Sequence, residues 1–449
     1  MLSYLKLKNF KSFKDITLDL RGAHGIPKKI AFIYGENGAG KSNLMSAMLF
    51  LGNTVETLVR QKNIQQPDFD LSILKEIDIN ALSEIEILGK KLFEYFIENN
   101  TDILSRLIKS SKSIGRKEPM SIEVGFYLDE KSGVYFLEFD DEKVISEKLI
   151  FCIKERNGIL YSIQQDRIFL SPSIFLDSAY NTELLDTIHK FWGKHTFMSI
   201  LFYERKTKNT EYIDTRIKNN IFKVLEWLYD SSVLCQGSIG HSGRVAIAFP
   251  FLQHLEKGKI NPRNLKDLKV FEKALNTFFT SLYSDIKNVY YKIDSYQYEL
   301  TFKKQISDKI MDIPVSLEST GTKKLLTIFP SIFSAIDEKT VLIDEIDTSI
   351  HDLMMCGIVE HLQESLQGQF IATTHNTLLM EKLPNDNVYI ISINAKGEKE
   401  IVCVSEYGFR TQKTNNMQKK YLNGDYGGIP YIGFLDLKEI VREMKIKYS

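Results

Sequence analysis

The chain has 449 residues, enough for two or three domains, and its 58 basic residues balance its 58 acidic ones. This balance excludes a strong overall field that would draw the whole protein to nucleic acid or to a membrane surface. The four cysteines have no paired spacing, which argues against a zinc site or a disulfide framework and fits a reducing compartment. The sequence shows neither a signal-peptide pattern nor a long uncharged apolar run, so we expect a cytoplasmic protein without a membrane partner.

The opening residues predict a hairpin that leads into a strand and a glycine-rich loop. Apolar and polar side chains alternate over 1–10 and 16–20, which predicts a hairpin. A short apolar strand, 30–34, then leads into Gly35–Ser42, which reads G-x-x-x-x-G-K-S and opens a helical pattern over 43–51. Strand, glycine loop and helix form the context that a phosphate-binding P-loop requires.

The residue types of this loop explain its chemistry. Glycines let the backbone fold tightly around phosphate oxygens, and the N–H groups of the helix N-terminus then face the anion. Lys41 is placed to reach the β- and γ-phosphates, and Ser42 is placed to hold Mg²⁺. We therefore predict a nucleoside triphosphate and Mg²⁺ as ligands. The nucleotide-binding residues predicted here are Gly35, Asn37, Gly38, Gly40, Lys41, Ser42 and Asn43.

The middle of the chain changes pattern twice. Apolar residues at three- and four-residue steps predict helix over 71–111, and alternating runs over 121–165 predict an antiparallel sheet. Helical patterns at 182–195 and 213–228 follow, and 290–302 reads as one or two strands. We expect four parts: the N-terminal half of an ATPase head at 1–60, a helical segment and antiparallel lobe at 61–180, a mainly helical insertion with partner or oligomer contacts at 181–300, and the C-terminal half of the head at 301–449.

The last part has a clear α/β pattern. Helices are predicted at 322–336, 350–365 and 435–446, strands at 341–343, 370–373 and 388–393, and an ordered glycine-rich loop at 421–430.

An apolar strand, Thr340–Ile343, ends in the carboxylates Asp344 and Glu345. Asp344 is placed to support Mg²⁺, directly or through water, and Glu345 to orient or deprotonate the attacking water. Two exposed acids at a strand end are the plain alternative, but a P-loop upstream favours a Walker B segment.

Three further segments narrow the class. Residues 346–351 directly follow the acids, His375 follows the next apolar strand, and Ser319 and Gly321 open a helix whose N-terminus can bind an anion. Taken singly, Ser319 could be only an N-cap and His375 only a strand-end histidine.

Together, in the order P-loop, signature, Walker B, D-loop and H-loop, these motifs resemble ATP-binding-cassette ATPases, and among them the soluble SMC/RecF-type branch. Within that branch the chain resembles the AAA-family ATPases of bacterial abortive-infection and phage-defence systems. The resemblance is carried by residues 5–15, 318–326, 344–351 and 421–430 and is thin between 170 and 289.

The resemblance implies an α/β fold, an ABC-type P-loop ATPase head with a mixed sheet, flanking helices, an antiparallel lobe and a helical insertion. It implies hydrolysis of ATP to ADP and phosphate between two head-to-tail copies. Ser319 and Gly321 would contact the γ-phosphate held by Lys41 of the partner subunit. His375 would contact the same phosphate in cis beside Glu345, and Lys41 and these two are the predicted catalytic residues.

Two elements of the resemblance are less defined by the residues. Lys11 stands where such ATPases often place a basic residue near the nucleotide base or phosphates. A glutamine that couples Mg²⁺ to the lobe usually follows the first sheet, and Gln164 and Gln165 are candidates that the sequence does not distinguish from surface glutamines.

Three functions compete. The favoured one is an ATPase switch that controls a separately encoded effector, such as a nuclease or toxin. The alternative is a DNA repair or recombination ATPase of the RecF/SMC type that binds DNA directly, which overall neutrality does not exclude. A fused metal nuclease is disfavoured, because Asp425, Asp436 and Glu439 are too isolated to hold its cations. A scaffold without activity would need a lost catalytic acid, yet Glu345 is present.

Overall fold

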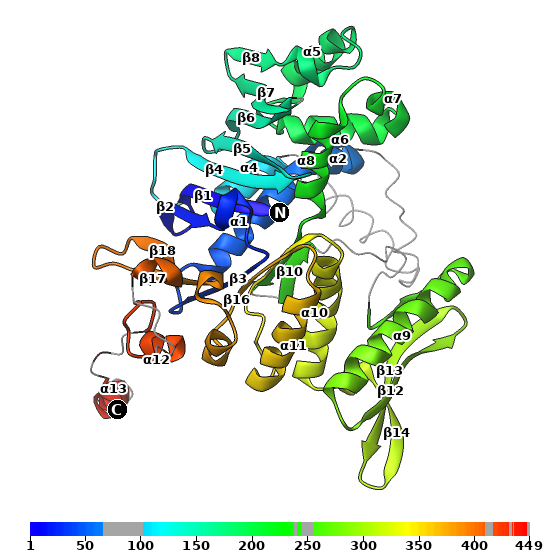
Figure 1. Ribbon diagram of the computed structural model, residues 1–449, viewed down its shortest axis with the longest axis vertical. Coiled ribbons are helices and arrows are strands. Elements are labelled where there is room, and N and C mark those ends of the chain that lie inside the picture. Colours follow the sequence, from blue (N-terminus) through cyan, green and yellow to red (C-terminus); the bar gives the residue numbers. More distant parts are fainter. Residues whose placement is uncertain are drawn as a thin grey trace.

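The computed structural model describes residues 1–65, 102–153, 155–237, 240–244, 255–408, 416–430, 433 and 435–446. Its strands form three sheets, and Figure 1 shows an antiparallel lobe at one end, a central mixed sheet, and a smaller sheet that projects from the opposite end. None of the helices in these ranges is long and apolar enough to cross a bilayer.

The central sheet is mixed, with parallel strands inside and antiparallel strands at its edges. Its order is β10 (Gly240–Arg244), β9 (Ser232–Gly237), β15 (Thr340–Ile343), β16 (Gln369–Thr373), β3 (Ile30–Gly35), β17 (Val388–Ile393) and β18 (Lys399–Cys403). Because β9, β15, β16 and β3 run the same way, their carboxyl ends meet at one edge, where α/β proteins bind ligands.

The inner strands are buried along their whole length, since both faces of this sheet are covered. One face packs with the lobe and with α1 (Lys41–Val55), and contributes Ile33 and Ile371 to that core. The other face packs with α10 (Thr320–Ile336) and α11 (Asp352–Ser365).

The lobe is a fully antiparallel sheet that leans on α1. Its order is β2 (Phe13–Asp19), β1 (Leu2–Phe10), β4 (Met120–Leu128), β5 (Lys131–Phe139), β6 (Val144–Ile153), β7 (Arg156–Gln164) and β8 (Arg167–Leu170). The helices of this part are α2 (Thr57–Gln65), α4 (Ile103–Ser111), α5 (Tyr180–Phe191), α6 (Phe197–Thr207), α7 (Thr210–Asp214) and α8 (Asn219–Asp230).

The third sheet directly precedes the signature in the chain. It consists of β11 (Lys257–Lys259), β12 (Ile286–Asp294), β13 (Gln297–Ile306) and β14 (Lys309–Pro314), and it packs on α9 (Leu265–Leu282). In Figure 1 this unit projects away from the central sheet.

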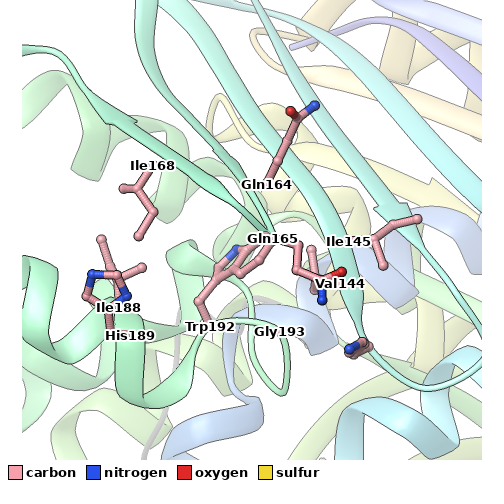
Figure 2. Close-up of a pocket in the computed structure, with 10 residues that line it drawn as sticks. Val144, Ile145, Gln164, Gln165, Ile168, Ile188, His189, Trp192 and Gly193 are labelled. Atoms are coloured by element: carbon pink, nitrogen blue, oxygen red, sulfur yellow. The ribbon is translucent and has the colours of Figure 1, made fainter.

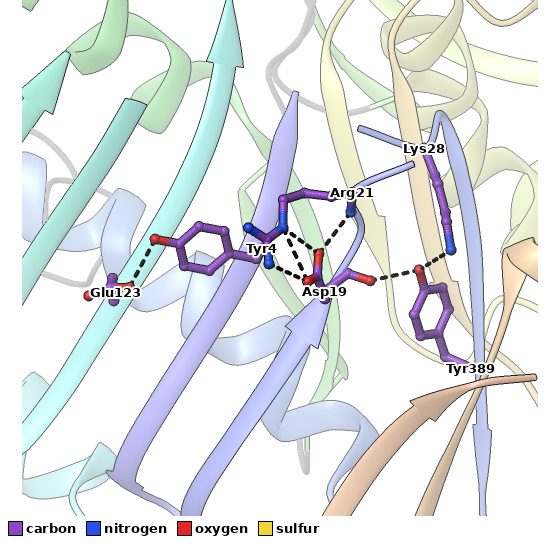
Figure 3. Close-up of polar contacts among 6 residues, drawn as sticks. All are labelled: Tyr4, Asp19, Arg21, Lys28, Glu123 and Tyr389. Carbon is purple, nitrogen blue, oxygen red and sulfur yellow. Dashed lines mark hydrogen bonds and ion pairs between the residues drawn. The ribbon is translucent and has the colours of Figure 1, made fainter. Parts of the chain in front are cut away.

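Polar contacts join the lobe to the central sheet at the ends of β1 and β2 (Figure 3). The hydroxyl of Tyr389 on β17 donates to the backbone carbonyl of Asp19, and Lys28 donates to that hydroxyl at 2.8 Å. Arg21 forms an ion pair with the Asp19 carboxylate, and Tyr4 donates to Glu123 across the lobe at 2.9 Å. These bonds fix the β1–β2 hairpin relative to β3 and the P-loop.

Tyr421 and Gly428 lie beside β3, which leads into the P-loop. The rings of Tyr421 in α12 (Met417–Leu422) and Tyr34 in β3 meet edge to face, with centroids 5.8 Å apart. A Cβ on Gly428 would lie 3.5 Å from the Cα of Gly35. The glycine-rich segment after α12 is therefore an ordered loop against β3, as the sequence predicts, and α13 (Leu437–Ile446) follows.

The predicted α/β fold is confirmed, with a mixed sheet, flanking helices and an antiparallel lobe. Two local predictions differ. Residues 213–228 are not one helix, because α7 ends at Asp214 and α8 begins at Asn219. The helix predicted at 182–195 ends at Phe191, two residues before Gly193, whose φ of +94° breaks the helical backbone. Of the helical stretch predicted over 71–111, residues 71–101 lie outside the described residues, and α4 (Ile103–Ser111) confirms the remainder.

The part at 181–300 contains more than helices. It supplies β9 to the central sheet and most of the projecting sheet, β11, β12 and the start of β13. The division of the chain at 60, 180 and 300 stays a prediction.

Candidate active site

The P-loop lies between β3 and α1, and its geometry needs glycine. Gly38 and Gly40 have φ values of +82° and +104°, in the left-handed region that side chains disfavour. A Cβ on Gly40 would also lie 2.7 Å from the ring of Phe13. No side chain caps the N-terminus of α1 at Gly40, so its first N–H groups remain available to an anion.

Lys41 points back into the loop that precedes it. Its ammonium donates to the carbonyls of Gly35 at 2.7 Å and Glu36 at 3.2 Å, and the residue is only 6 % exposed. Burial lowers the pKa of Lys41, while Glu345 and Asp344 are the nearest carboxylates that oppose the shift. A cation held only by carbonyls can move to phosphate oxygens without breaking an ion pair.

A second lysine braces the same loop from β18. Lys399 donates to the carbonyl of Gly38 at 2.6 Å and to the Ser12 hydroxyl at 2.8 Å. Asn43, in the first turn of α1, donates to the same hydroxyl at 2.7 Å. Ser42 and Asn37 are exposed, so the outer side of the loop faces solvent. Sequence reasoning missed Lys399, because nothing local connects β18 to the P-loop.

The carboxylate of Asp344 is fully buried at the end of β15. Its Oδ1 accepts a 2.6 Å hydrogen bond from the hydroxyl of Thr373 on β16, and its backbone N–H donates to Leu234 on β9. Its Oδ2 is buried and has no hydrogen-bond partner among the described residues. A buried carboxylate oxygen without a donor is suited to a cation.

Glu345 sits in a strained backbone conformation with a φ of +46°. Its backbone N–H donates to the Thr373 hydroxyl at 2.7 Å, and its Oε2 accepts from Thr348 at 3.2 Å. Thr373 therefore holds both acids at once, a role that the sequence did not reveal. The position of Thr373, at the end of the apolar strand that follows Walker B in the chain, is the sequence feature that could have indicated this role.

His375 lies on the same edge. Its backbone N–H donates to Asp347 Oδ2 at 3.1 Å, and its side chain is exposed. Burial and then Lys41 lower its pKa, while Asp347 and Glu345 oppose the shift. Burial also lowers the pKa of Lys11, against the opposing influence of Cys235 and Asp344. The structure thus brings Lys41, Asp344, Glu345, His375 and Lys11 into one electrostatic neighbourhood.

Of the signature residues, Ser319 is exposed at the start of α10, whereas Gly321 is buried in its first turn. Ser319 is its N-cap, and its Oγ accepts the N–H of Thr322 at 3.1 Å. A Cβ on Gly321 would lie 2.5 Å from the carbonyl oxygen of Ser349, so only glycine lets this turn approach the D-loop. Further along α10, burial lowers the pKa of Lys324, opposed by Glu345 and Asp344.

The glutamines predicted to couple Mg²⁺ to the lobe do not reach this edge. Gln164 and Gln165 line a cavity of about 200 Å³ in the lobe, beside Trp192 and His189 (Figure 2). Strands β4, β5 and β6 separate β7 from β1. At the usual strand spacing this is roughly 19 Å.

Gln236 belongs to a strand that does reach this edge. It lies near the carboxyl end of β9, which pairs in parallel with β15, and it follows Leu234, the backbone partner of Asp344, by two residues. The apolar run Ser232–Cys235 before it was the signal that sequence reasoning missed.

These residues fit Mg²⁺ and a triphosphate. The unpartnered Oδ2 of Asp344, the exposed hydroxyl of Ser42, the uncapped start of α1 and the carbonyl-bound Lys41 lie around one sheet edge. Two oxygen ligands with room for phosphate oxygens and water are what Mg²⁺ commonly takes at phosphate sites.

The family described as "AAA domain, putative AbiEii toxin, Type IV TA system" matches residues 30–381. The chain belongs to this family. This AAA-domain protein is therefore an ATPase, and the matched range includes its P-loop, signature, Walker B acids and His375.

Individual relatives are more distant. An "ATP/GTP phosphatase" of Helicobacter pylori is 21 % identical over 395 residues, which cover 85 % of the AAA-domain chain and 87 % of the relative. "Chromosome partition protein Smc" of Methanocaldococcus jannaschii is 52 % identical over 54 residues, 12 % of this chain and 4 % of that protein.

Two solved structures are similar to the AAA-domain chain over most of its length. An Smc head bound to the C-terminal winged-helix domain of ScpA has a TM-score of 0.42 and 14 % identity, and covers 89 % of this chain and 97 % of that one. The SMC head domain from Thermotoga maritima has a TM-score of 0.39 and 14 % identity, with 90 % and 98 % covered.

Proposed function

We propose that this ATPase is a switch of a bacterial anti-phage system of the abortive-infection type. Two copies close head to tail over ATP, and the change of state controls a separately encoded effector such as a nuclease or toxin. The description of the family, which names a toxin and a toxin–antitoxin system, supports the setting. The relative named "ATP/GTP phosphatase" supports nucleotide turnover.

One observation favours an ATP site that is shared between two copies of the chain. The groups that hold the acids and the loop in place are buried: Lys41 is 6 % exposed, and Asp344 and Thr373 are fully buried. The groups predicted to touch the outer phosphate, His375 and Ser319, are exposed. Ligand sites usually bury most of the ligand surface, so an open half-site favours closure by a second copy.

Each residue then has one task. Lys41 leaves the Gly35 carbonyl for the β- and γ-phosphate oxygens, and the start of α1 binds the remaining phosphate charge. Ser42 and Asp344 would hold Mg²⁺, which neutralises phosphate charge when bound. Glu345 accepts a proton from the attacking water, and His375 orients the γ-phosphate beside it. Ser319 and Gly321 of the partner subunit close the site.

Gln236 is assigned the coupling task that the sequence analysis gave to Gln164 or Gln165. A residue near the end of β9 lies beside the Asp344 strand and at the base of the lobe, so it can report the state of the site to the lobe. Gln236→Ala should slow turnover, whereas Gln164→Ala should leave it unchanged.

Mixing two inactive variants tests the shared site. Ser319→Arg and Lys41→Ala should each abolish turnover. An equimolar mixture should recover at most about a quarter of native turnover, because half of random dimers are mixed and each mixed dimer holds one complete site. Recovery supports a shared site, and a mixture as inactive as its parts contradicts it.

Glu345→Gln should keep ATP binding, stop turnover and trap the closed assembly. Mass measured with and without ATP should show an ATP-dependent oligomer for this variant.

The defence role is tested by phage challenge of cells that carry the gene and its neighbouring reading frame, native or with Glu345→Gln. Equal phage yield with native and variant genes would count against it.

Direct DNA binding is the second candidate, favoured by the 54-residue similarity to an Smc protein. It predicts that Glu345→Gln binds duplex DNA more tightly with ATP than without, and less tightly as salt rises. Absence of ATP-stimulated binding leaves the effector switch.

A further inference from the structure

A buried ion pair stands directly beside the signature serine. Glu318 precedes Ser319, and its side chain is only 2 % exposed. Its Oε2 accepts a 2.8 Å hydrogen bond from the ammonium of Lys304. Its Oε1 is buried and has no hydrogen-bond partner among the described residues. Lys304 therefore supplies the compensation for this buried charge, and the position of one side chain depends on the other.

Lys304 is itself held firmly. It lies in β13, with Ile286 of β12 opposite on one side and Met311 of β14 opposite on the other. Its side chain is 16 % exposed, and its ammonium lies 3.8 Å from a carboxylate oxygen of Asp285. A lysine between two backbone-paired strands has little freedom to follow a moving partner. The projecting sheet is thus the fixed end of the pair.

The loop that carries Glu318 has few other attachments. It comprises the short helix η6 (Val315–Leu317) between β14 and α10, and although Val315 is buried, Leu317 is 74 % exposed. The Ser319 hydroxyl is turned inward to cap α10 through Thr322. Lys323 also donates to the Ser316 carbonyl at 2.7 Å, and Gly321 packs against Ser349. The ion pair is therefore a direct tie between the first turn of α10 and the projecting sheet.

We propose that Lys304 and Glu318 are positioning residues for ATP hydrolysis: the projecting sheet holds the start of α10 so that Ser319 meets the nucleotide of the partner subunit. This inference rests on the proposed shared site. Neither residue touches the nucleotide. They act through Ser319, and a displacement of about 1 Å at a transition-state contact is enough to slow a reaction severely.

The test measures the ATP turnover of Glu318→Gln and of a control variant at Lys303, which lies next to Lys304 on β13. Glu318→Gln keeps the volume of the side chain and removes its charge, while Lys304 keeps Asp285 nearby. We expect kcat to fall about tenfold with KM for ATP unchanged, because the P-loop of the same copy is untouched. Lys303→Met is the matched control, since Lys303 is 43 % exposed and lies 4.0 Å from Asp312. It should turn over ATP at the native rate.

Reversal of both charges separates positioning from simple loss of stability. Lys304→Glu alone should be as slow as Glu318→Gln or slower, because it places two carboxylates together. Lys304→Glu combined with Glu318→Lys should recover at least half of native turnover. Failure of the double variant to recover turnover, with a native unfolding midpoint, would overturn the proposal.

Ser319→Arg keeps the two proposals distinguishable. If Ser319→Arg blocks turnover while Glu318→Gln is native, the shared site stands and the positioning role is wrong. If Ser319→Arg turns over ATP normally, the shared site itself is wrong. If Glu318→Gln lowers ATP affinity and the unfolding midpoint together, with kcat unchanged, the pair only stabilises the fold and the positioning role is again wrong.

Discussion

Two fully buried carboxylates, one in the lobe and one at the edge of the central sheet, have opposite surroundings. Glu147 on β6 is saturated by donors within the chain, whereas Asp344 at the end of β15 has a bonded Oδ1 and an unpartnered Oδ2. The donors to Glu147 are the hydroxyls of Tyr135 and Tyr161, the indole of Trp192 and the backbone N–H groups of Phe197 and Met198.

The difference separates a structural acid from a functional one. Five N–H and O–H groups converge on Glu147 and tie β6 to the start of α6, so the chain itself offsets part of the cost of burying this charge, although burial still raises the pKa of Glu147. Asp344 Oδ2 has no such donor among the described residues, which suits the cation site proposed above. Burial alone does not indicate function, but burial with an unpartnered oxygen at a sheet edge does.

The largest effect expected concerns Asp344. Asp344→Asn keeps an oxygen for Thr373 and removes the charge that would hold Mg²⁺. Turnover should fall on the order of 10²–10³-fold, from the several kcal/mol that a metal ion contributes to the transition state. The free energy of unfolding without nucleotide should stay the same or rise, because a buried charge is removed. A native rate in steady-state ATPase measurements would show that Asp344 is not a metal ligand.

Glu147→Gln should lower stability and leave turnover unchanged, the opposite of Asp344→Asn. Its amide NH₂ would face N–H donors from Trp192 and Phe197, so unfolding should become easier by about 2–3 kcal/mol. The turnover of each folded molecule should not change. Glu123→Gln is the control, since Glu123 lies on the same sheet, is partly exposed and accepts one hydrogen bond, from Tyr4. The free energies of unfolding are measured by chemical denaturation. Equal losses in Glu147→Gln and Glu123→Gln would contradict a special structural role for Glu147.

The sequence predicted those parts of the site that are local in the chain. Gly35–Ser42 needs only β3 before it and α1 after it, and Asp344 and Glu345 need only the apolar strand that they end. Their function follows from residue type and position within one element. The same holds for the lobe, whose hairpins are joined by short turns and whose alternation sets their register.

The missed residues depend on pairings between distant segments. Gln236 gains its place from the parallel pairing of β9 with β15, and Lys399 from the packing of β18 beside the P-loop. Thr373 becomes significant only once β16 lies next to Asp344. Gln164 shows the converse, since a glutamine after a sheet satisfied the expected order but lies several strands from the P-loop.

A moderate effect is expected for Lys399, which lies at the sheet edge but belongs to no motif. Lys399→Met removes the donor that holds the Gly38 carbonyl, so the P-loop loses a support before nucleotide arrives. We expect ATP to bind about tenfold more weakly, the equivalent of one to one and a half hydrogen bonds. Lys396→Met is the control, because Lys396 is exposed in the turn between β17 and β18. Equal affinities by calorimetry would remove Lys399 from the site.

The smallest effect expected is on the pH dependence of stability, and it distinguishes a buried structural histidine, His195, from the exposed His375 of the site. His195 is 3 % exposed at the start of α6, with its ring nitrogens bonded to Thr57 and Gln61, and burial lowers its pKa to about 4 from an ordinary value of 6.5. The unfolded chain therefore binds a proton in this window that the folded chain refuses, and stability is lost as pH falls from 6.5 toward 4.

Between pH 7.5 and pH 5.5 the loss should be about 1 kcal/mol, measured from unfolding midpoints. His195→Gln should abolish this part of the pH dependence, although its stability at pH 7.5 should be lower. His375, exposed at the sheet edge, should behave differently: His375→Gln should slow turnover at every pH and leave the part of the acid sensitivity that His195 causes in place. If His375→Gln removes the acid sensitivity of unfolding and His195→Gln retains it, then the buried histidine does not set this pH dependence. The contrast between Glu147 and Asp344, which rests on the same division between structural and functional groups, would then fail as well.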